Sequence, residues 1–432
     1  MRQKLLRLGA DELTYEIRGI VKKAELLVNL GYDVLWENIG DPIQKNKKLP
    51  DWMKEIIASI LKEDYSYGYS HSKGLLETRK FLATRCNQLG GVQIQPEDIT
   101  FFNGLGDAIQ KIYQYLLPTS RIIGPSPSYS THSSAEAAHA NNHPITYRLD
   151  PNNRWFPDIE DLRLKVKYNE NLVGIMVINP DNPTGMVYPQ RILEDIIAIA
   201  REFNLFLIFD EIYMNIVYNG AERCTLAEVI GDAPGISLKG ISKEFPWPGA
   251  RCGWAEYYNR TSDKDFEKLC ETIDNSKMIE VSSTRLPQLA IPRIMSDPRY
   301  PDYLIETNKR IGQRSKYLEE FFADIPYIQF NKTNGAFYNT IIFKEGVLKP
   351  DQSMLIADEK VKNMLEGWLK PDLALDKRFV YYLLMAKQVC VVPISSFSSD
   401  LRGFRITLLE ENEDQLKETL SRVRSGILEY CK

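Results

Sequence analysis

The chain has 432 residues, of which 44% are hydrophobic and 26% are charged, and its formal net charge is −4. This composition is typical of a globular protein, and the length suits one large α/β domain with a smaller companion. No block of Lys or Arg stands out that could neutralise a nucleic-acid backbone, and no run approaches the roughly 18 apolar residues of a membrane span. We therefore expect neither nucleic acid nor a membrane among its partners.

Cysteine and histidine spacing bears on the compartment and on metal binding. The six cysteines lie far apart without a CxxC pair, and the four histidines form no HExxH motif and no paired spacing with cysteine or carboxylate. Widely spaced cysteines indicate a reducing compartment, and zinc sites need closer ligand spacing. The first seven residues also lack the apolar core of a signal peptide. We expect a cytoplasmic protein without a metal site.

The first hundred residues predict mainly helices. Apolar spacing indicates helices at 13–30, 51–61 and 75–89, with a short strand and turn at 34–42. Between the second and third helices, Tyr65, Tyr67 and Tyr69 lie in one glycine-containing loop. Such a loop could form a binding surface, or its rings could simply pack together.

From residue 99 onward, strands alternate with helices. The helices are expected at 106–117, 130–140, 189–203 and 262–274. The strands are expected at 99–102, 121–123, 145–148, 173–178, 205–209, 235–238 and 252–256. This alternation predicts an α/β fold whose mainly parallel, seven-stranded sheet is covered on both faces.

The C-terminal third loses this alternation. Helices are predicted at 302–322, 377–386 and 412–430, and strands at 327–330, 336–343, 390–393 and 403–408. Elements in this order indicate a smaller α+β domain. We expect a large cofactor-binding domain at 51–305, and a small domain built from 1–50 and 306–432.

Four turns that directly follow predicted strands carry unusual residues. Gly104 opens a predicted helix, whose free N–H groups could bind an anion, although such a turn is more often only a tight connection. The ring of Tyr129 could stack on a flat ligand or pack in the core. Two prolines in NPDNPTG, at 179–185, stiffen the turn that holds Asn182. Asp210 ends an apolar strand, where a carboxylate needs a strong partner.

A fifth turn, in the stretch GISKEFPWPGARCGW at 240–254, places Lys243 eight residues before Arg251. Its prolines and glycines exclude a regular helix, so Lys243 is expected in a turn past a strand end. A lysine considered alone is most often a solvated charge. Together, however, the five turns supply an amine, a phosphate cradle, a stacking ring and a carboxylate. Pyridoxal phosphate is the cofactor that requires all of them.

The motifs resemble a known family. NPDNPTG at 179–185, DEIY at 210–213 and SKEFPWPGARCGW at 242–254 are similar to the signature of the class I/II aminotransferases, which are fold type I pyridoxal-phosphate enzymes. The order and spacing match from Tyr15 to about Arg405. Within the family, the bacterial alanine aminotransferases are most similar, through YEIRG at 15–19, NIG at 38–40, WFPD at 155–158 and GISK at 240–243.

The resemblance assigns roles around the cofactor ring. It implies that Lys243 forms the Schiff base with pyridoxal 5'-phosphate and then moves a proton between the substrate Cα and the cofactor. Asp210 is expected to pair with the pyridine nitrogen. Asn182 and Tyr213 are expected to donate hydrogen bonds to the phenolic oxygen, and Tyr129 to stack on the ring.

Further matches concern the phosphate and the substrate. The resemblance implies that the backbone of Gly104 and Leu105, together with Arg251, holds the phosphate. Tyr69 matches a tyrosine that reaches the phosphate in the neighbouring subunit, which implies a homodimer with shared active sites. Arg405 matches the arginine that binds the substrate α-carboxylate through both ends of its guanidinium group.

Other positions bear on the substrate. Gly40, Tyr15 and Asn182 are expected near it. Arg18 lies in an N-terminal segment that could close over the site, where it could pair with the distal carboxylate of glutamate; the alternative is a surface arginine. Enzymes specific for aspartate use an arginine from the partner subunit, and here the matching position is near Ile279, with Arg285 about one helical turn away.

One departure from the family pattern is Gly240, which stands where many members have a serine that binds the phosphate. Another group must then replace that hydroxyl. The alanine-type relatives share this glycine, so the departure favours them over the aspartate type.

We therefore expect a pyridoxal-phosphate-dependent aminotransferase that uses glutamate and 2-oxoglutarate together with alanine and pyruvate. The alternatives are an aspartate or aromatic aminotransferase, or a carbon–sulfur lyase on the same fold, since the substrate pocket directs the cofactor chemistry. A cofactor-sensing regulator is disfavoured, because the fifty residues before the sheet are too few and insufficiently basic for a DNA-binding domain.

Overall fold

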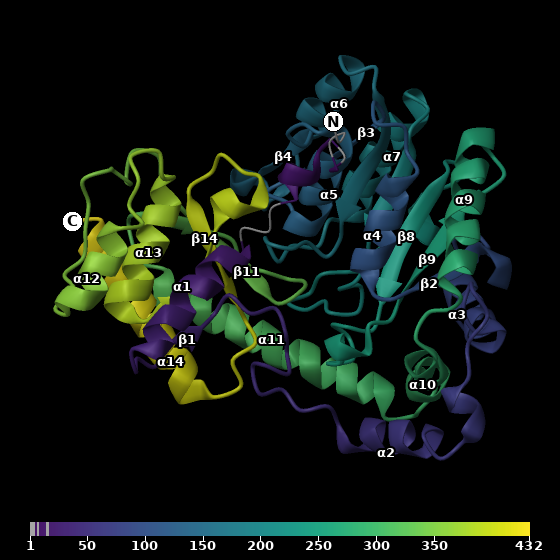
Figure 1. The fold of residues 1–432 in the computed structure, drawn as a ribbon, viewed down its shortest axis with the longest axis horizontal. Helices are drawn as coiled ribbons and strands as arrows, with labels where there is room; N and C mark the ends of the chain where they lie inside the picture. The colour runs from purple at the N-terminus through teal and green to yellow at the C-terminus, as the bar shows by residue number, and fades with distance from the viewer. Residues whose placement is uncertain (1–4, 7, 14–16) are drawn as a thin grey trace.

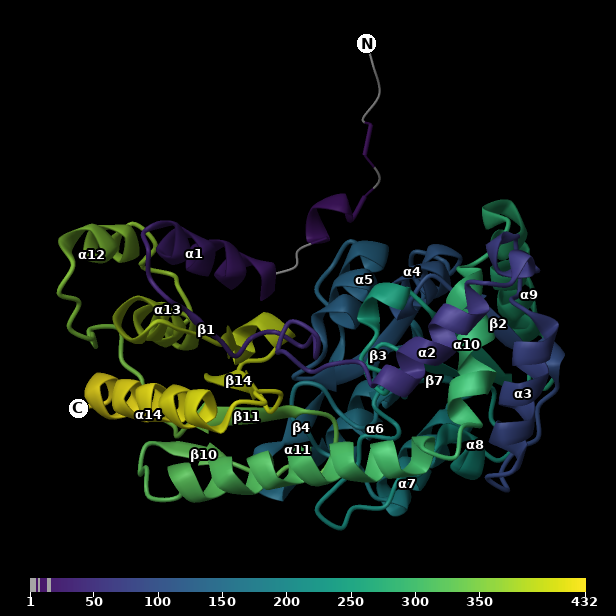
Figure 2. The same cartoon turned by 90° about the horizontal axis from the view of Figure 1, so that it is seen from below.

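The structure is a computed structural model that describes residues 5–6, 8–13 and 17–432, without the side chains of residues 17 and 18. A large β-sheet body and a smaller α+β body stand side by side (Figure 1). The long helix α11 (Tyr300–Phe322) runs along both of them, as Figure 2 shows. In the described part of the chain, no helix has the length and apolar character that crossing a membrane requires.

The large body is built on an eight-stranded sheet. In spatial order its strands are β2 (Ile99–Phe102), β9 (Gly253–Tyr258), β8 (Gly235–Gly240), β7 (Phe206–Asp210), β6 (Leu172–Ile178), β3 (Arg121–Ser126), β4 (Thr146–Asp150) and β5 (Phe156–Pro157). Strands β4, β3, β6, β7 and β8 run parallel, whereas β9 is antiparallel to both β8 and β2. All seven predicted strands are confirmed, and the two-residue edge strand β5 adds an eighth.

The central strands read as continuous apolar runs because both of their faces are buried. In β6, Ile175 and Val177 belong to one hydrophobic cluster, while Met176 and Ile178 belong to another on the opposite face. This alternation follows from the two-residue repeat of a strand. It explains why the sequence shows no polar face in this segment.

Helices surround this sheet. They are α2 (Asp51–Ile60), α3 (Leu76–Asn87), α4 (Leu105–Gln114), α5 (Ser130–Ala140), α6 (Ile159–Lys167), α7 (Gln190–Glu202), α8 (Leu226–Val229), α9 (Lys264–Glu280) and α10 (Arg285–Met295). Helices α6, α8 and α10 were not predicted. For α10 the physical reason is Pro292, which lies inside the helix, where proline is normally disfavoured. Helix α9 runs six residues beyond its predicted end at 274.

The smaller body joins the two ends of the chain. Its antiparallel sheet has the order β10 (Ile328–Phe330), β11 (Tyr338–Phe343), β14 (Gly403–Thr407) and β13 (Val392–Pro393). Strand β1 (Leu35–Trp36) pairs in parallel with β12 (Val389–Cys390). The surrounding helices are α1 (Ile17–Asn29), α12 (Glu359–Glu366), α13 (Leu375–Lys387) and α14 (Glu413–Tyr430). Helix α1 and strand β1 thus lie beside the C-terminal third, as the purple and yellow ribbons of Figure 1 show.

The predicted smaller α+β domain is confirmed in its architecture. One hydrophobic cluster combines Leu27 of α1 with Leu383 of α13 and Val423 of α14. Helix α12 was not predicted. Short 3-10 helices lie at η1 (Ala10–Glu12), η2 (Asp64–Tyr67), η3 (Pro96–Asp98), η4 (Pro151–Asn153), η5 (Pro248–Ala250) and η6 (Ile394–Phe397). The domain limits at residues 50 and 305 stay a prediction.

Candidate active site

A cavity of about 470 Å³ lies at the carboxyl ends of β6, β7 and β8. Open α/β sheets place their ligands at this edge, because the turns after parallel strands converge there. The cavity brings together most of the residues predicted from the sequence. Those that line it are Gly40, Leu105, Tyr129, Asn182, Asp210, Tyr213, Lys243, Arg251 and Arg405.

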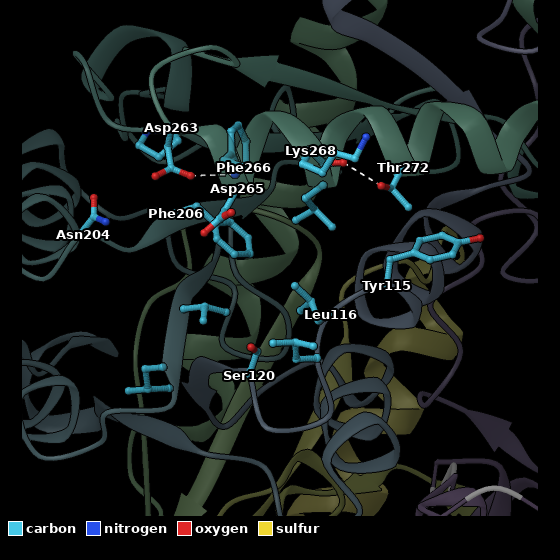
Figure 3. Close-up of a pocket in the computed structure, with 15 residues that line it drawn as sticks. Tyr115, Leu116, Ser120, Asn204, Phe206, Asp263, Asp265, Phe266, Lys268 and Thr272 are labelled. Carbon is cyan, nitrogen blue, oxygen red and sulfur yellow. Dashed lines mark hydrogen bonds between the residues drawn. The ribbon is translucent and has the colours of Figure 1, made fainter.

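A second large cavity, of about 600 Å³, lies at the opposite, amino ends of β6 and β7 (Figure 3). Its lining includes Tyr115, Phe206, Asp263 and Lys268. The residues singled out from the sequence do not line it. We therefore place the candidate active site at the carboxyl edge.

Lys243 lies just past the end of β8. Its Nζ donates a hydrogen bond of 2.6 Å to the carbonyl oxygen of Gly40. Burial lowers the pKa of Lys243 from its ordinary value to about 8, against the opposing effect of the Asp41 carboxylate. A larger fraction of this amine than of an ordinary lysine is therefore neutral near neutral pH, as a nucleophile or a base requires.

Asp210 ends β7 with only 3% of its surface exposed. Its Oδ1 accepts a hydrogen bond of 3.1 Å from the backbone N–H of Ile212, and its Oδ2 lies 2.9 Å from Nε2 of His132. His132 comes from α5, and sequence reasoning gave it no role. The signal that could have found it is its spacing, because His132 follows Tyr129 by three residues, about one helical turn.

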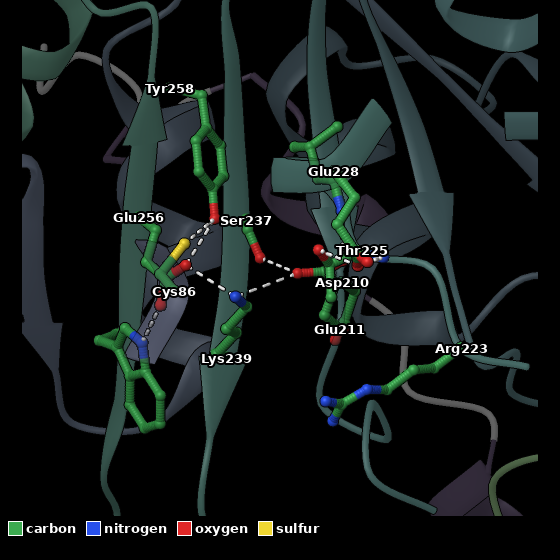
Figure 4. A network of polar contacts seen from close by, with 12 residues as sticks. Cys86, Asp210, Glu211, Arg223, Thr225, Glu228, Ser237, Lys239, Glu256 and Tyr258 are labelled. Atoms are coloured by element: carbon green, nitrogen blue, oxygen red, sulfur yellow. Dashed lines mark hydrogen bonds and ion pairs between the residues drawn. The ribbon is translucent and has the colours of Figure 1, made fainter. Parts of the chain in front are cut away.

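A buried polar network surrounds Glu211, the residue that follows Asp210 at the end of β7 (Figure 4). Glu211, next to Asp210, accepts a hydrogen bond from the hydroxyl of Ser237. Nζ of Lys239 lies 3.5 Å from Glu211 Oε2 and 2.7 Å from Glu256 Oε2. Burial raises the pKa of Glu211, although the nearby lysine counteracts this. The two neighbouring carboxylates, Asp210 and Glu211, are thus anchored by different sets of partners.

Gly104 and Arg251 meet at the start of α4. Gly104 has φ +87°, and a Cβ atom added there would lie only 2.3 Å from Nη2 of Arg251. The same Nη2 donates a hydrogen bond of 3.4 Å to the carbonyl oxygen of Asn103. The first N–H groups of a helix, beginning here with Leu105, have no partner within the helix. Together with the guanidinium group they can bind a phosphate.

Arg405, from β14, faces the same cavity. Nη1 donates to Asn182 Oδ1 at 3.1 Å, and Nη2 donates to the carbonyl oxygen of Asn38 at 2.7 Å. Its Nε is buried and has no hydrogen-bond partner among the described residues. The guanidinium group lies 4.3 Å from the centre of the Tyr338 ring. It is therefore held in place by one N–H of each Nη atom, while Nε–H has no partner and stays available for a carboxylate.

Tyr338 is a second residue that sequence reasoning missed. Its hydroxyl lies 3.0 Å from the hydroxyl of Tyr213, and burial raises the pKa of Tyr213. A Cβ atom added at Gly40 would lie 2.2 Å from the Tyr338 hydroxyl oxygen, which explains a glycine there. The sequence carries no signal for Tyr338, because it lies in an ordinary predicted strand.

Some predicted residues lie elsewhere. Tyr69 does not line the cavity of its own chain and is 82% exposed. Arg285 also lies outside this cavity, where it donates a hydrogen bond to the carbonyl oxygen of Tyr69. Tyr15 lies outside the described residues, as does the side chain of Arg18.

A Cβ atom at Gly240 would lie 3.0 Å from the carbonyl oxygen of Cys252, so a serine there would be tightly packed.

Known proteins resemble this chain over nearly its whole length. The family model for aminotransferase class I and II matches residues 33–423. The chain is 53% identical over 432 residues, all of both chains, to an uncharacterized aminotransferase of Methanocaldococcus jannaschii. It is 30% identical over 351 residues to the glutamate-pyruvate aminotransferase AlaA of Escherichia coli K12, which covers 80% of this chain and 85% of that one.

A solved structure gives the same assignment. An alanine aminotransferase from Pyrococcus furiosus superposes with a TM-score of 0.85 and 29% identity, over 99% of this chain and 100% of that one. The fold type predicted from the motifs is thereby confirmed. The protein belongs to the class I and II aminotransferases.

Proposed function

We propose that this aminotransferase uses pyridoxal 5'-phosphate to move an amino group between glutamate or alanine and the matching 2-oxo acids. The observation that carries the proposal is the convergence of Lys243, Asp210, Arg251 and Arg405 on one cavity. The names of two relatives, a glutamate-pyruvate and an alanine aminotransferase, support these substrates.

The residues present fit this cofactor. A phosphate would be held by the guanidinium group of Arg251 and by the backbone N–H groups that follow Gly104, where a larger residue would clash with the arginine. The buried Asp210 carboxylate suits a protonated ring nitrogen. Asn182 and Tyr213 carry the donors for the phenolic oxygen, and both line the cavity.

When bound, pyridoxal phosphate supplies an aldehyde that takes the amino group and a ring that withdraws electrons from Cα. The protein's own groups position and move protons. Lys243, with its lowered pKa, can take a proton from the substrate Cα and return one to the cofactor carbon. Arg405 binds the α-carboxylate, with Nε as the available donor. The carboxylate of Asp210 would pair with the ring nitrogen.

The remaining assignments are proposals of the same kind. We propose a homodimer with shared active sites, because the exposed Tyr69 could reach only a neighbouring subunit's cofactor. Mass measurement in solution tests this, and a fully active monomer would contradict it. We also propose a cytoplasmic location, which the six free, buried cysteines support.

The decisive experiment incubates the purified protein and pyridoxal phosphate with alanine and 2-oxoglutarate. We expect pyruvate and glutamate without ammonia. Release of pyruvate, ammonia and sulfide from cysteine without any 2-oxo acid would instead indicate a carbon–sulfur lyase, and no change in the absorbance of the bound cofactor with any amino acid would reject both functions. A screen of about twenty amino donors then fixes the substrate, since one methylene group is often worth only about 1–3 kcal/mol.

A further inference from the structure

A fully buried lysine lies outside the cavity, near the turn at 103–105 where the phosphate would bind, which we call the phosphate turn. The side chain of Lys277, near the end of α9, is 0% exposed. Its Nζ lies 2.6 Å from Oε2 of Glu280 and 3.3 Å from Oδ2 of Asp107, and 5.1 Å from the centre of the Phe102 ring. A buried ammonium group is costly unless it is paired, so its two carboxylate partners hold it there.

Both carboxylates also bind Asn103, the residue directly before Gly104. Asp107 Oδ2 accepts a hydrogen bond of 3.1 Å from the backbone N–H of Asn103. Glu280 Oε1 accepts one of 2.5 Å from Asn103 Nδ2. Lys277 therefore closes a ring of polar contacts whose fourth member is Asn103. The ring fixes the entry to the turn where the phosphate would bind.

A strained turn makes this arrangement possible. Helix α9 ends at Glu280. The next residue, Val281, has φ +75° and ψ −65°, and the N–H of Ser282 donates a hydrogen bond of 3.1 Å to the carbonyl oxygen of Glu280. These features define a γ-turn of the rare, strained kind, unusual for a β-branched residue. The reversal brings Thr284 back, so that its N–H donates to Asn103 Oδ1 at 3.1 Å and its hydroxyl to the carbonyl oxygen of Arg251 at 3.2 Å.

Charge gives a second reason for a lysine here. Asp107 and Glu280 lie close to the start of α4, where two negative charges would repel a phosphate. Lys277 balances them together with Lys111, whose Nζ lies 3.4 Å from Glu280 and 3.9 Å from Asp107. Removing Lys277 would leave one net negative charge beside the phosphate turn.

We propose that Lys277 is a positioning residue for the cofactor phosphate. It acts through Asn103 and through the charge balance, without touching the cofactor itself. The inference rests on the proposed use of pyridoxal phosphate. The inference predicts an effect on binding of the phosphate and none on binding of the rest of the cofactor, because the ring of contacts supports only the phosphate turn.

The test compares two ligands, pyridoxal phosphate and pyridoxal, which lacks the phosphate. Their dissociation constants are measured by absorbance titration of the full-length protein after removal of bound cofactor. We expect Lys277→Met to raise the dissociation constant of pyridoxal phosphate by about tenfold to a hundredfold, the range for loss of a charge-assisted contact. The dissociation constant of pyridoxal should change little. Lys268→Met is the matched control, because Lys268 lies on the same helix with a 73% exposed side chain.

Two further variants keep the test decisive if Lys277→Met does not fold. Lys277→Arg should retain most of the affinity, and Asn103→Ala should reproduce the phosphate-specific loss with the ion pairs intact. Equal losses for both ligands, or no loss for either, would overturn the inference. Failure of the unaltered protein to bind either ligand would instead reject the proposed cofactor.

Discussion

Replacing Lys45 should disturb the loop at 37–45, part of which lines the active-site cavity. Its Nζ lies 2.8 Å from Glu37 Oε1, 2.9 Å from Glu410 Oε2 and 2.9 Å from the carbonyl oxygen of Trp36. The side chains of all three charged residues are at most 4% exposed. Between Glu37 and Lys45 the chain presents the carbonyl oxygen of Gly40 to Lys243. The ion-pair cluster thus closes this loop at its base.

The expected magnitude follows from burial. Lys45→Met keeps the length of the side chain and removes the charge, which leaves Glu37 and Glu410 without their shared cation. Breaking a buried pair by removing one partner costs about 3–5 kcal/mol, and two stranded carboxylates place this variant in the upper part of that range. The hydrogen bond of 2.6 Å from the Thr407 hydroxyl to Glu37 Oε2 offsets part of the loss.

The assay is unfolding by urea, monitored by circular dichroism. It compares the free energies of unfolding of the two proteins, provided that their m-values are equal. The stability loss should depend on pH. Burial already raises the pKa of Glu37, and Lys45 opposes this, so the variant's pKa should be higher still. When folding raises the pKa of a carboxyl group, the protein becomes less stable as pH rises from the group's pKa in the unfolded chain, about 4.3, through its pKa in the folded protein. The deficit should therefore grow with pH over this range and shrink toward pH 4.

The control is Lys54→Met, because Lys54 pairs with Asp51 on the surface, where the two side chains are 52% and 89% exposed. No measurable change is expected there. If Lys45→Met is as mild as this control, or if its deficit does not change with pH, the cluster does not stabilise the loop as reasoned.

Three further predictions concern the cavity. The rate at which Lys243 reacts with cyanate in the cofactor-free protein should rise with pH to a midpoint near its pKa of about 8 and level off above; a midpoint near 10.5 would refute the lowered pKa. Gly40→Ala should raise the KM for amino donors, because the new Cβ atom would meet the Tyr338 hydroxyl, and Tyr338→Phe should partly rescue it. Arg18→Ala should raise the KM for glutamate more than for alanine, and equal effects would exclude a contact with the distal carboxylate.

The elements nearest the cavity were the most predictable from sequence. Strands β6 and β7 read as apolar runs because a parallel sheet buries both faces, and each ends in a polar turn whose residues converge at one edge. The site residues on those turns could therefore be placed near one another before the structure was known. Their roles as ligands of a cofactor still rest on the family resemblance and await experiment.

The partners of these residues were less predictable, because they depend on contacts between distant segments. His132 meets Asp210 across 78 residues, and Tyr338 meets Tyr213 across 125. The spacing of His132 from Tyr129 is the one local signal for these partners, and Tyr338 has none. The Lys45 cluster spans most of the chain, since Glu410 lies in the C-terminal third.

Lys277 shows most clearly where local pattern fails. The predicted helix ended at 274, so a lysine and a glutamate at 277 and 280 would have been assigned to a solvated linker, the usual place for charged residues. In the structure the helix continues and a strained turn folds Glu280 beneath Asn103. The motif residues of this family can thus be identified from local sequence, whereas the charges that hold them in position become visible only when the chain is folded.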